Sequence, residues 1–190
     1  MSFHYPIQSL PFASPKCVAP IPTADPIVRR ALVWASLEGP ITAISSETIT
    51  RSGPSPSSEC VLLETADDVL VLDIVRSVSD PESRRRDEAA WRAFGWTALT
   101  LLPGEIEREA RFVNASHIWR NRRTPVPNSL RFQIMDRLRE DGPLRTHELL
   151  TGLRAERDPL PVLFALACGD EVLIDLDGDL GGDSVVRIRL

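Results

Sequence analysis

Lysine, cysteine and long apolar runs are scarce in this sequence of 190 residues. Lys16 is the only lysine, so the other basic residues among the 22 lysines and arginines are all arginine. The three cysteines, Cys17, Cys60 and Cys168, lie far apart and show no metal-ligand spacing. Such usage suits a reducing compartment, and we expect a cytoplasmic protein without a disulfide framework.

A membrane span and a secretory leader are also missing from the pattern. Apolar runs such as residues 161–168 are far too short to cross a bilayer. The N-terminus has no basic stretch followed by an apolar one, so we expect neither secretion nor a membrane partner. Glycine-rich phosphate loops and the Gly-x-Ser-x-Gly elbow are absent, which leaves nucleotide hydrolysis and serine-hydrolase chemistry without support.

The overall composition, with 43% apolar and 26% charged residues, is that of an ordinary globular protein. A net charge of −5 argues against a protein that coats nucleic acid indiscriminately. The arginines are nevertheless unevenly distributed. They gather in two clusters: Arg84, Arg85 and Arg86, and Arg120, Arg122 and Arg123.

The first two thirds of the chain alternate between helical and strand patterns. Residues 1–24 contain five prolines and no helical period, which predicts an extended arm or a flexible tail. Helices are predicted over 27–37, 82–94 and 105–119, and short strands over 41–49, 60–65, 69–75 and 96–102. In the last of these helices we expect Ile106, Ala110, Val113 and Ile118 to be buried.

A second unit follows residues 124–127, whose two prolines indicate a linker. Short helices are predicted near 130–138, 146–153 and 158–167. Alternating segments at 171–177 and 184–190 flank a glycine-rich turn, which is typical of a β-ribbon. Three helices followed by a ribbon is the order of a winged helix-turn-helix, to which we assign residues 128–190.

This order of elements resembles that of TnsA-like endonucleases, the subunits of heteromeric transposases that nick the transposon end. The resemblance covers residues 25–190. It is carried by residues 94–106 (FGWTALTLLPGEI), by the arginine-rich segment 118–123 (IWRNRR) and by the winged-helix ending. It implies an α/β fold over residues 25–123, with a restriction-endonuclease-like mixed sheet flanked by helices.

The catalytic signature of that family is incomplete here. Its carboxylates hold a divalent metal, and a lysine two residues after an acid on one strand stabilises the developing negative charge. Aligned on the hairpin, the first carboxylate falls on Glu59 and the strand acid on Asp73, while Val75 replaces the lysine. Arg76 is expected on the opposite face of the strand, and Lys16 is the only lysine that another segment could supply.

Asp73 and Glu59 are therefore residual candidates for catalysis and for a metal, which would be Mg²⁺. The first-helix acid of the family has no clear counterpart, because Asp25 precedes the helix and Glu38 ends it. Asp73 has a second interpretation, as a solvated strand-end carboxylate or one paired with Arg76. The departures imply a degenerate site without a cofactor, and an active Mg²⁺-dependent endonuclease remains the alternative.

Both arginine clusters are candidates for contacts with DNA phosphates, because guanidinium forks match phosphate oxygens. The first cluster has acidic neighbours and could equally be a solvated helix face. The second, Arg120, Arg122 and Arg123, has no local acid and carries Trp119, so we favour it.

The predicted winged helix lacks the features of a DNA reader. Its third helix, residues 161–168, is apolar, and its ribbon is rich in aspartate. These features fit core packing or a protein interface. We therefore expect a catalytically degenerate, DNA-binding protein with a protein partner on its winged helix, such as a transposase or another mobile-element subunit. A protein–protein adaptor that never binds DNA is the other alternative.

Overall fold

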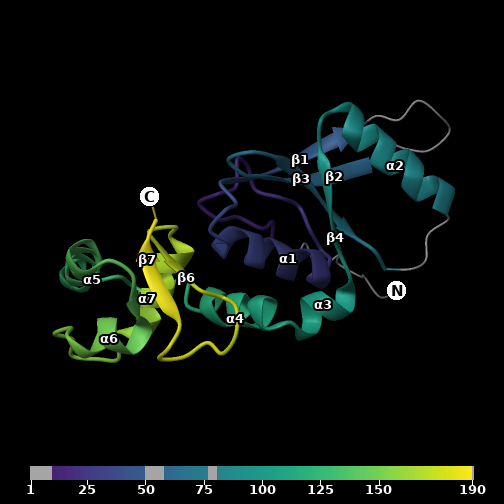
Figure 1. The fold of residues 1–190 in the computed structure, drawn as a ribbon. Helices are drawn as coiled ribbons and strands as arrows, with labels where there is room; N and C mark the ends of the chain where they lie inside the picture. Colours follow the sequence, from purple (N-terminus) through teal and green to yellow (C-terminus); the bar gives the residue numbers. More distant parts are fainter. Residues whose placement is uncertain (1–9, 50–57, 77–80, 190) are drawn as a thin grey trace, which may run out of the picture.

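The computed structural model describes residues 10–49, 58–76 and 81–189 as a mixed α/β fold (Figure 1). Its first unit contains a four-stranded sheet in the order β1 (Ala43–Ile49), β2 (Ser58–Glu64), β3 (Val69–Ile74) and β4 (Thr97–Leu101). β1, β2 and β3 are antiparallel neighbours, and β4 runs parallel to β3. The α/β class and the order of these elements agree with the sequence-based prediction.

Two helices cover the two faces of this sheet. α1 (Pro26–Leu37) shares the main hydrophobic cluster with Leu63, whereas Trp91 of α2 (Pro81–Ala93) packs on Leu62 and Val71. Figure 1 shows the two helices on opposite sides of the strands. Because α2 links β3 to β4, the parallel pair is joined by a helical crossover, as parallel strands require.

The single helix predicted over residues 105–119 is wrong. The chain forms two helices there, α3 (Pro103–Arg108) and α4 (Ala110–Trp119). Glu109 between them has an extended ψ of 138°, which interrupts the helical phase. Ala110 and Val113, which we expected in the core, are therefore exposed, and Phe112 and Ala115 are buried instead.

The C-terminal unit has the helix–strand–helix–helix–strand–strand order. Its elements are α5 (Asn128–Asp141), β5 (Leu144–Arg145), α6 (Thr146–Thr151), α7 (Leu160–Cys168), β6 (Val172–Ile174) and β7 (Val185–Ile188). The strands form an antiparallel sheet in the order β5-β7-β6. Every side chain from Val162 to Cys168 is buried, and α7 packs on α4 and α1. The apolar third helix therefore belongs to the core of this chain.

The segment before α1 lies against the body of the protein. Phe12 and Ile21 form a backbone bridge and are both buried, and Cys17 is bridged to Ile44 of β1. Over residues 10–24 the chain is thus an extended arm that contributes side chains to the core, and the flexible-tail alternative does not describe it.

A polar cluster around the buried Lys16 ties this arm to the C-terminal unit. The Lys16 ammonium donates to the Glu38 carbonyl at 2.6 Å and lies 3.6 Å from the Asp170 carboxylate. Arg189 Nε lies 3.7 Å from the same carboxylate, and its guanidinium donates to the carbonyls of Gly39 and Ile41. We call these side chains the Lys16–Asp170–Arg189 cluster. It joins the arm, the α1–β1 connection and both ends of the β6–β7 ribbon.

None of the helices in the described ranges is long and apolar enough to cross a membrane.

Lys16 makes the stability of the fold depend on pH. Burial lowers the pKa of Lys16 from 10.5 to about 8, although Asp170 opposes the shift. Between these values the unfolded chain binds more protons than the folded one, so the free energy of unfolding rises with pH through this window. We expect wild type to gain stability relative to Lys16→Met between pH 8 and 10, measured by urea denaturation. Parallel pH profiles for the two proteins would contradict this assignment.

Candidate functional site

Glu59 and Asp73, the predicted metal ligands, lie on opposite faces of the sheet. The β2–β3 register pairs Leu62 with Val71, and both contact Trp91 of α2. Asp73 comes two residues after Val71 and therefore faces α2, whereas Glu59, three residues before Leu62, faces the other side. The structure does not bring the two carboxylates together, so they do not form one metal site.

Asp73 connects the two parallel strands of the sheet. It is half-buried and lies opposite Thr100 in the β3–β4 register, where the Thr100 hydroxyl donates to its carboxylate at 3.5 Å. This hydrogen bond links the ends of β3 and β4, whereas Arg76, which the sequence offered as an ion-pair partner for Asp73, pairs with Asp25 instead.

A cavity of about 300 Å³ adjoins Glu59 on the α1 face of the sheet. Arg76 also lines it, since this side chain faces away from Asp73 as the strand alternation predicts. Five apolar side chains form most of the remaining wall: Ile21, Val28, Val61, Leu72 and Ile74. The arm, the start of α1 and the ends of β2 and β3 thus enclose a largely apolar pocket with one carboxylate and one guanidinium.

Asp25 is the second carboxylate beside this cavity, and both of its oxygens are engaged. Oδ1 accepts hydrogen bonds from the backbone N–H groups of Ile27 and Val28, which caps α1. Oδ2 forms an ion pair with Arg76. The Asp-Pro sequence predicts the cap, but no local pattern predicts the ion pair, because Arg76 comes from the end of β3.

The residues around the cavity do not fit a divalent metal. Mg²⁺ requires several oxygen ligands at octahedral positions, and here Asp25 is committed to the cap and to Arg76. Glu59 is the only carboxylate among the lining residues, and Arg76 beside it carries a positive charge. Within the described residues, no group of three or more His, Cys, Asp or Glu side chains could hold a metal ion. We therefore derive no metal-dependent step at this site.

The second arginine cluster lies at the end of α4 beside an aromatic pair. Arg120, Arg122 and Arg123 are exposed. The Arg122 guanidinium lies 5.4 Å from the Trp119 ring and donates to the Trp119 carbonyl at 3.1 Å. Trp119 stacks in turn on Phe12 of the arm, with ring centroids 5.4 Å apart.

Arg29 lies between this arginine cluster and the cavity, and no sequence-based prediction included it. Its guanidinium lies 6.0 Å from the Phe12 ring and donates to the Leu10 carbonyl at 2.9 Å. Arg29 comes one residue after Val28, which lines the cavity. Ring contacts link Arg29 to Phe12, Phe12 to Trp119 and Trp119 to Arg122. These four side chains, with the adjacent Arg120 and Arg123, are called the arginine–aromatic surface. A doublet of arginines in the first helix was the only sequence signal for it.

The first arginine cluster lies elsewhere. Arg85 and Arg86 are exposed on α2, and the side chain of Arg84 lies outside the described residues. Because α2 and α4 lie on opposite sides of the sheet (Figure 1), the two clusters do not form one continuous basic surface.

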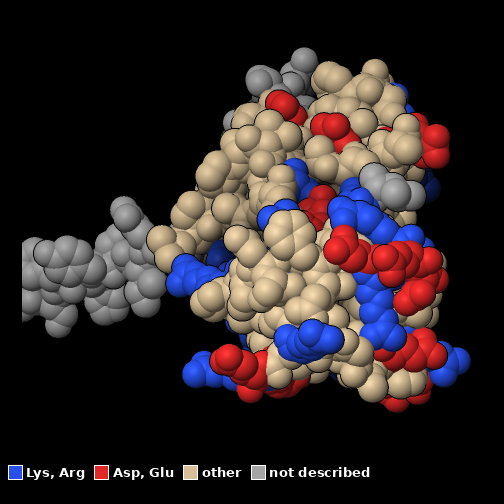
Figure 2. Space-filling model, turned by 90° about the vertical axis from the view of Figure 1, so that its left-hand side faces the viewer, with Lys and Arg blue, Asp and Glu red and all other residues tan. Residues whose placement is uncertain are grey.

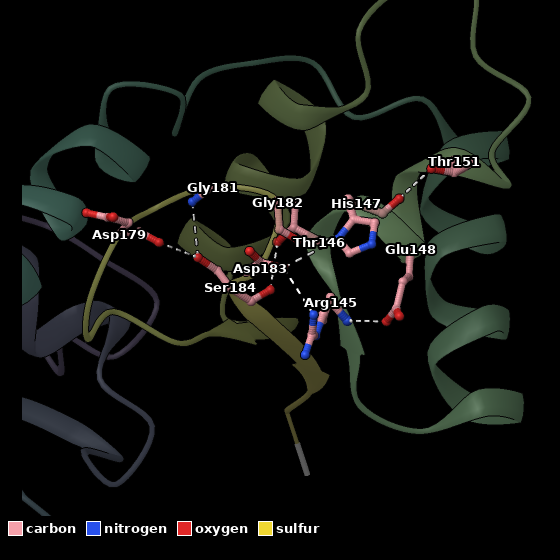
Figure 3. A network of polar contacts seen from close by, with 10 residues as sticks. All are labelled: Arg145, Thr146, His147, Glu148, Thr151, Asp179, Gly181, Gly182, Asp183 and Ser184. Atoms are coloured by element: carbon pink, nitrogen blue, oxygen red, sulfur yellow. Dashed lines mark hydrogen bonds and ion pairs between the residues drawn. The ribbon is translucent and has the colours of Figure 1, made fainter.

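The β6–β7 loop, which would be the wing of a winged helix-turn-helix, is held against the protein from both sides. The buried Asn114 amide of α4 donates to the carbonyls of Leu176 and Gly178, at 2.9 and 2.8 Å. On the other side, the Thr146 hydroxyl donates to the Ser184 carbonyl at 2.9 Å (Figure 3). A wing fixed in this way does not project into a DNA groove.

The surface of the C-terminal unit has mixed charge. Arg145 pairs with Asp183 at 3.2 Å across the wing, and Arg131 of α5 pairs with Glu171 at 2.6 Å. Figure 2 shows acidic and basic side chains side by side on this face, without a uniformly basic area. Nonspecific phosphate binding depends on unneutralised basic charge, so this face is a poor DNA contact.

Asp25 gives a test of how the cavity is built. Asp25→Ala removes the α1 cap and the Arg76 ion pair, and should lower the free energy of unfolding by about 1–2 kcal/mol. Asp25→Asn keeps an oxygen for the cap but loses the ion pair with the half-exposed Arg76, so its cost should be about 0.5 kcal/mol. Urea denaturation of both variants measures the difference. Equal losses would mean that the cap contributes little.

Known proteins offer no counterpart with which this geometry can be compared. No protein-family model, no curated protein and no solved structure matches the chain.

Proposed function

We propose that this chain is a catalytically degenerate, TnsA-like protein that binds DNA without cutting it and acts with a protein partner. The observation that carries the proposal is the cavity between α1, β2 and β3. It sets Glu59, one of the two carboxylates that the TnsA likeness assigns to a metal, among mostly apolar residues and next to the guanidinium of the Asp25–Arg76 ion pair. An apolar wall offers no ligands to Mg²⁺, and Asp73 faces the other side of the sheet.

The arrangement of elements supports the fold part of the proposal. A helix, three antiparallel strands, a crossover helix and a parallel fourth strand are the order that a restriction-endonuclease-like domain requires. The C-terminal order, with its first strand paired to the last, suits a winged helix-turn-helix. Fold alone does not define function, so the DNA-binding part must come from the surface.

The arginine–aromatic surface is the DNA contact that we propose. Arg120, Arg122 and Arg123 expose three guanidinium groups in one turn, and Arg29 adds a fourth next to the cavity. Trp119 and Phe12 hold two of these arginines by ring contacts, which lowers the entropy lost when they bind phosphate. Contacts of this kind give affinity without sequence preference.

The protein partner is proposed by the same analogy with TnsA-like endonucleases. α7 is buried, so a partner of the winged-helix unit would contact its outer helix α5, where Phe132 is 63% exposed. A transposase or another mobile-element subunit is the kind of partner that the TnsA likeness implies.

Charge reversal tests the DNA contact. The triple variant Arg120→Glu, Arg122→Glu and Arg123→Glu should weaken binding to duplex DNA and reduce the slope of log affinity against log salt by about 2.7, because three phosphate contacts are lost. Electrophoretic mobility shifts over a range of salt measure both quantities.

The matched control reverses three arginines away from this surface: Arg108, Arg139 and Arg157, all exposed. It makes the same change of net charge and should keep most of the salt dependence. Equal loss in both triple variants would point to a general charge effect. Absence of DNA binding by wild type would favour the adaptor alternative.

Plasmid nicking tests the degenerate site. With Mg²⁺ or Mn²⁺, wild type should give no more nicked plasmid than Asp73→Ala or Glu59→Ala, because these carboxylates do not share a face of the sheet. Metal-dependent nicking that disappears with either substitution would restore the active endonuclease.

A further inference from the structure

A second cavity, of about 440 Å³, lies where the two units meet. The first unit contributes residues 37–40, at the end of α1, and Arg111 of α4. The C-terminal unit contributes residues 173–177, Val185 and Arg187 of the β6–β7 ribbon. Figure 1 shows this ribbon next to α4. Cavities of this size at the junction of two units are typical sites for small molecules. We call this one the junction cavity.

One face of the β6–β7 ribbon forms a wall of the junction cavity. Leu173 is paired with Arg187, and the backbone N–H of Asp175 donates to the Val185 carbonyl at 2.9 Å. Because alternate residues of a strand face the same side, these four side chains share one face. The wall therefore combines two apolar side chains with one carboxylate and one guanidinium. The hydrogen bonds of Asn114 to the following loop hold this wall in place.

Arg187 gives the wall an unpaired positive charge. Its guanidinium forms no ion pair and no hydrogen bond with the described residues. One of its terminal nitrogens lies 3.4 Å from the position that a Cβ on Gly39 would take, so a glycine there leaves room for the guanidinium. The planar fork of an arginine can donate two parallel hydrogen bonds to a carboxylate. Arg187 is thus suited to bind the carboxylate of a ligand.

Glu38 and Asp177 give the same cavity a negative region. Burial raises the pKa of Glu38, and the charge of Asp177 also raises it, although Trp34 and Arg111 act in the opposite direction. The Glu38 carboxyl group therefore lies in a poorly solvated position, within the electrostatic influence of a second carboxylate. A cation between these two groups would offset their repulsion.

Arg111 compensates this negative region only in part. Its Nε lies 2.9 Å from the Glu109 carboxylate, and its guanidinium lies 4.9 Å from the Phe112 ring. One guanidinium held in this position faces three carboxylates, those of Glu109, Glu38 and Asp177. Negative charge is therefore left over on this side of the junction cavity.

We infer that the junction cavity binds a small zwitterion of the amino-acid class, either a free amino acid or a short peptide with apolar side chains. The ammonium group of the ligand binds at Glu38 and Asp177, and its carboxylate binds Arg187. The apolar side chains of Leu173 and Val185 contact the rest of the ligand.

The spacing of the charges agrees with a small ligand. Arg187 lies opposite Leu173, and Asp177 follows Leu173 by four residues. Four residues of extended chain span about 13 Å at most, and the long Arg187 side chain can reach across part of this distance. One molecule that carries both charges can therefore contact both groups.

A ligand with a single charge fits the junction cavity less well. A simple anion could pair with Arg187, but it would approach Asp175 on the same wall. A simple amine could pair with Glu38 and Asp177, but it would leave Arg187 without a partner. A ligand of both signs meets both requirements.

Isothermal titration calorimetry on the full-length chain tests the inference with two probes, leucine and the dipeptide leucyl-leucine. At least one probe should bind saturably, and the one that binds more tightly identifies the size of the ligand. N-acetyl-leucine lacks the ammonium group and leucinamide lacks the carboxylate, and the dipeptide can be blocked in the same two ways. Each blocked analogue should bind about tenfold more weakly or less.

Two substitutions of exposed side chains test the assigned contacts. Arg187→Met and Asp177→Asn should each raise the Kd of the probe about tenfold or more, because each removes one charge that contacts the ligand. Arg157→Met and Asp67→Asn are the matched controls. They make the same changes at exposed positions outside the junction cavity and should leave binding unchanged.

Absence of saturable binding by both probes overturns the inference. Binding that persists in both Arg187→Met and Asp177→Asn overturns it as well, as does equal binding of a blocked analogue. The junction cavity shares no residue with the arginine–aromatic surface, so failure here leaves the proposed function untouched.

Discussion

The architecture of this protein depends on one buried charge arrangement, the Lys16–Asp170–Arg189 cluster. Lys16 comes from the arm, Asp170 follows α7, and Arg189 follows β7, so three distant parts of the chain meet at one point. Buried charges are costly unless they are paired and hydrogen-bonded. Here the carboxylate compensates both cations, and the backbone carbonyls of Glu38, Gly39 and Ile41 accept hydrogen bonds from them. The cost of leaving any one partner alone fixes the C-terminal unit against the first.

That fixed arrangement leaves the proposed winged helix-turn-helix without a free recognition helix. α7, the third helix of the C-terminal unit, has its side chains in the core against α4 and α1. Asn114 reaches across the same junction and holds the wing. α7 is thus buried and the β6–β7 loop is held by hydrogen bonds, although both would be exposed in an independent domain. The arginine–aromatic surface lies outside the C-terminal unit, and this is where we place the DNA contact.

Local sequence patterns predicted most helices and strands. They did not predict which residues from different elements lie together. The hairpin around residues 66–68 and the α7 apolar run follow from composition alone. No glycine or proline in the sequence marks the break between α3 and α4 at Glu109. The burial of Phe112 and Ala115 therefore could not be predicted. Alternation along a strand shows which of its own residues share a face of the sheet. Only the register between β2 and β3 shows that Glu59 and Asp73 lie on opposite faces. The burial of Phe12 depends on Trp119, far along the chain, and proline-rich local sequence concealed it.

The single lysine has a consequence for how this surface can be regulated. Because Lys16 is buried, every basic side chain that the protein exposes, histidine apart, is a guanidinium. Guanidinium groups remain protonated at all physiological pH values and are not substrates for lysine acetylation or ubiquitination. Neither acidification nor acyl transfer can therefore switch off the positive surface of this protein. If this surface is the DNA contact that we propose, its affinity for phosphate would be controlled by ionic strength and by competing anions rather than by changes of its charge.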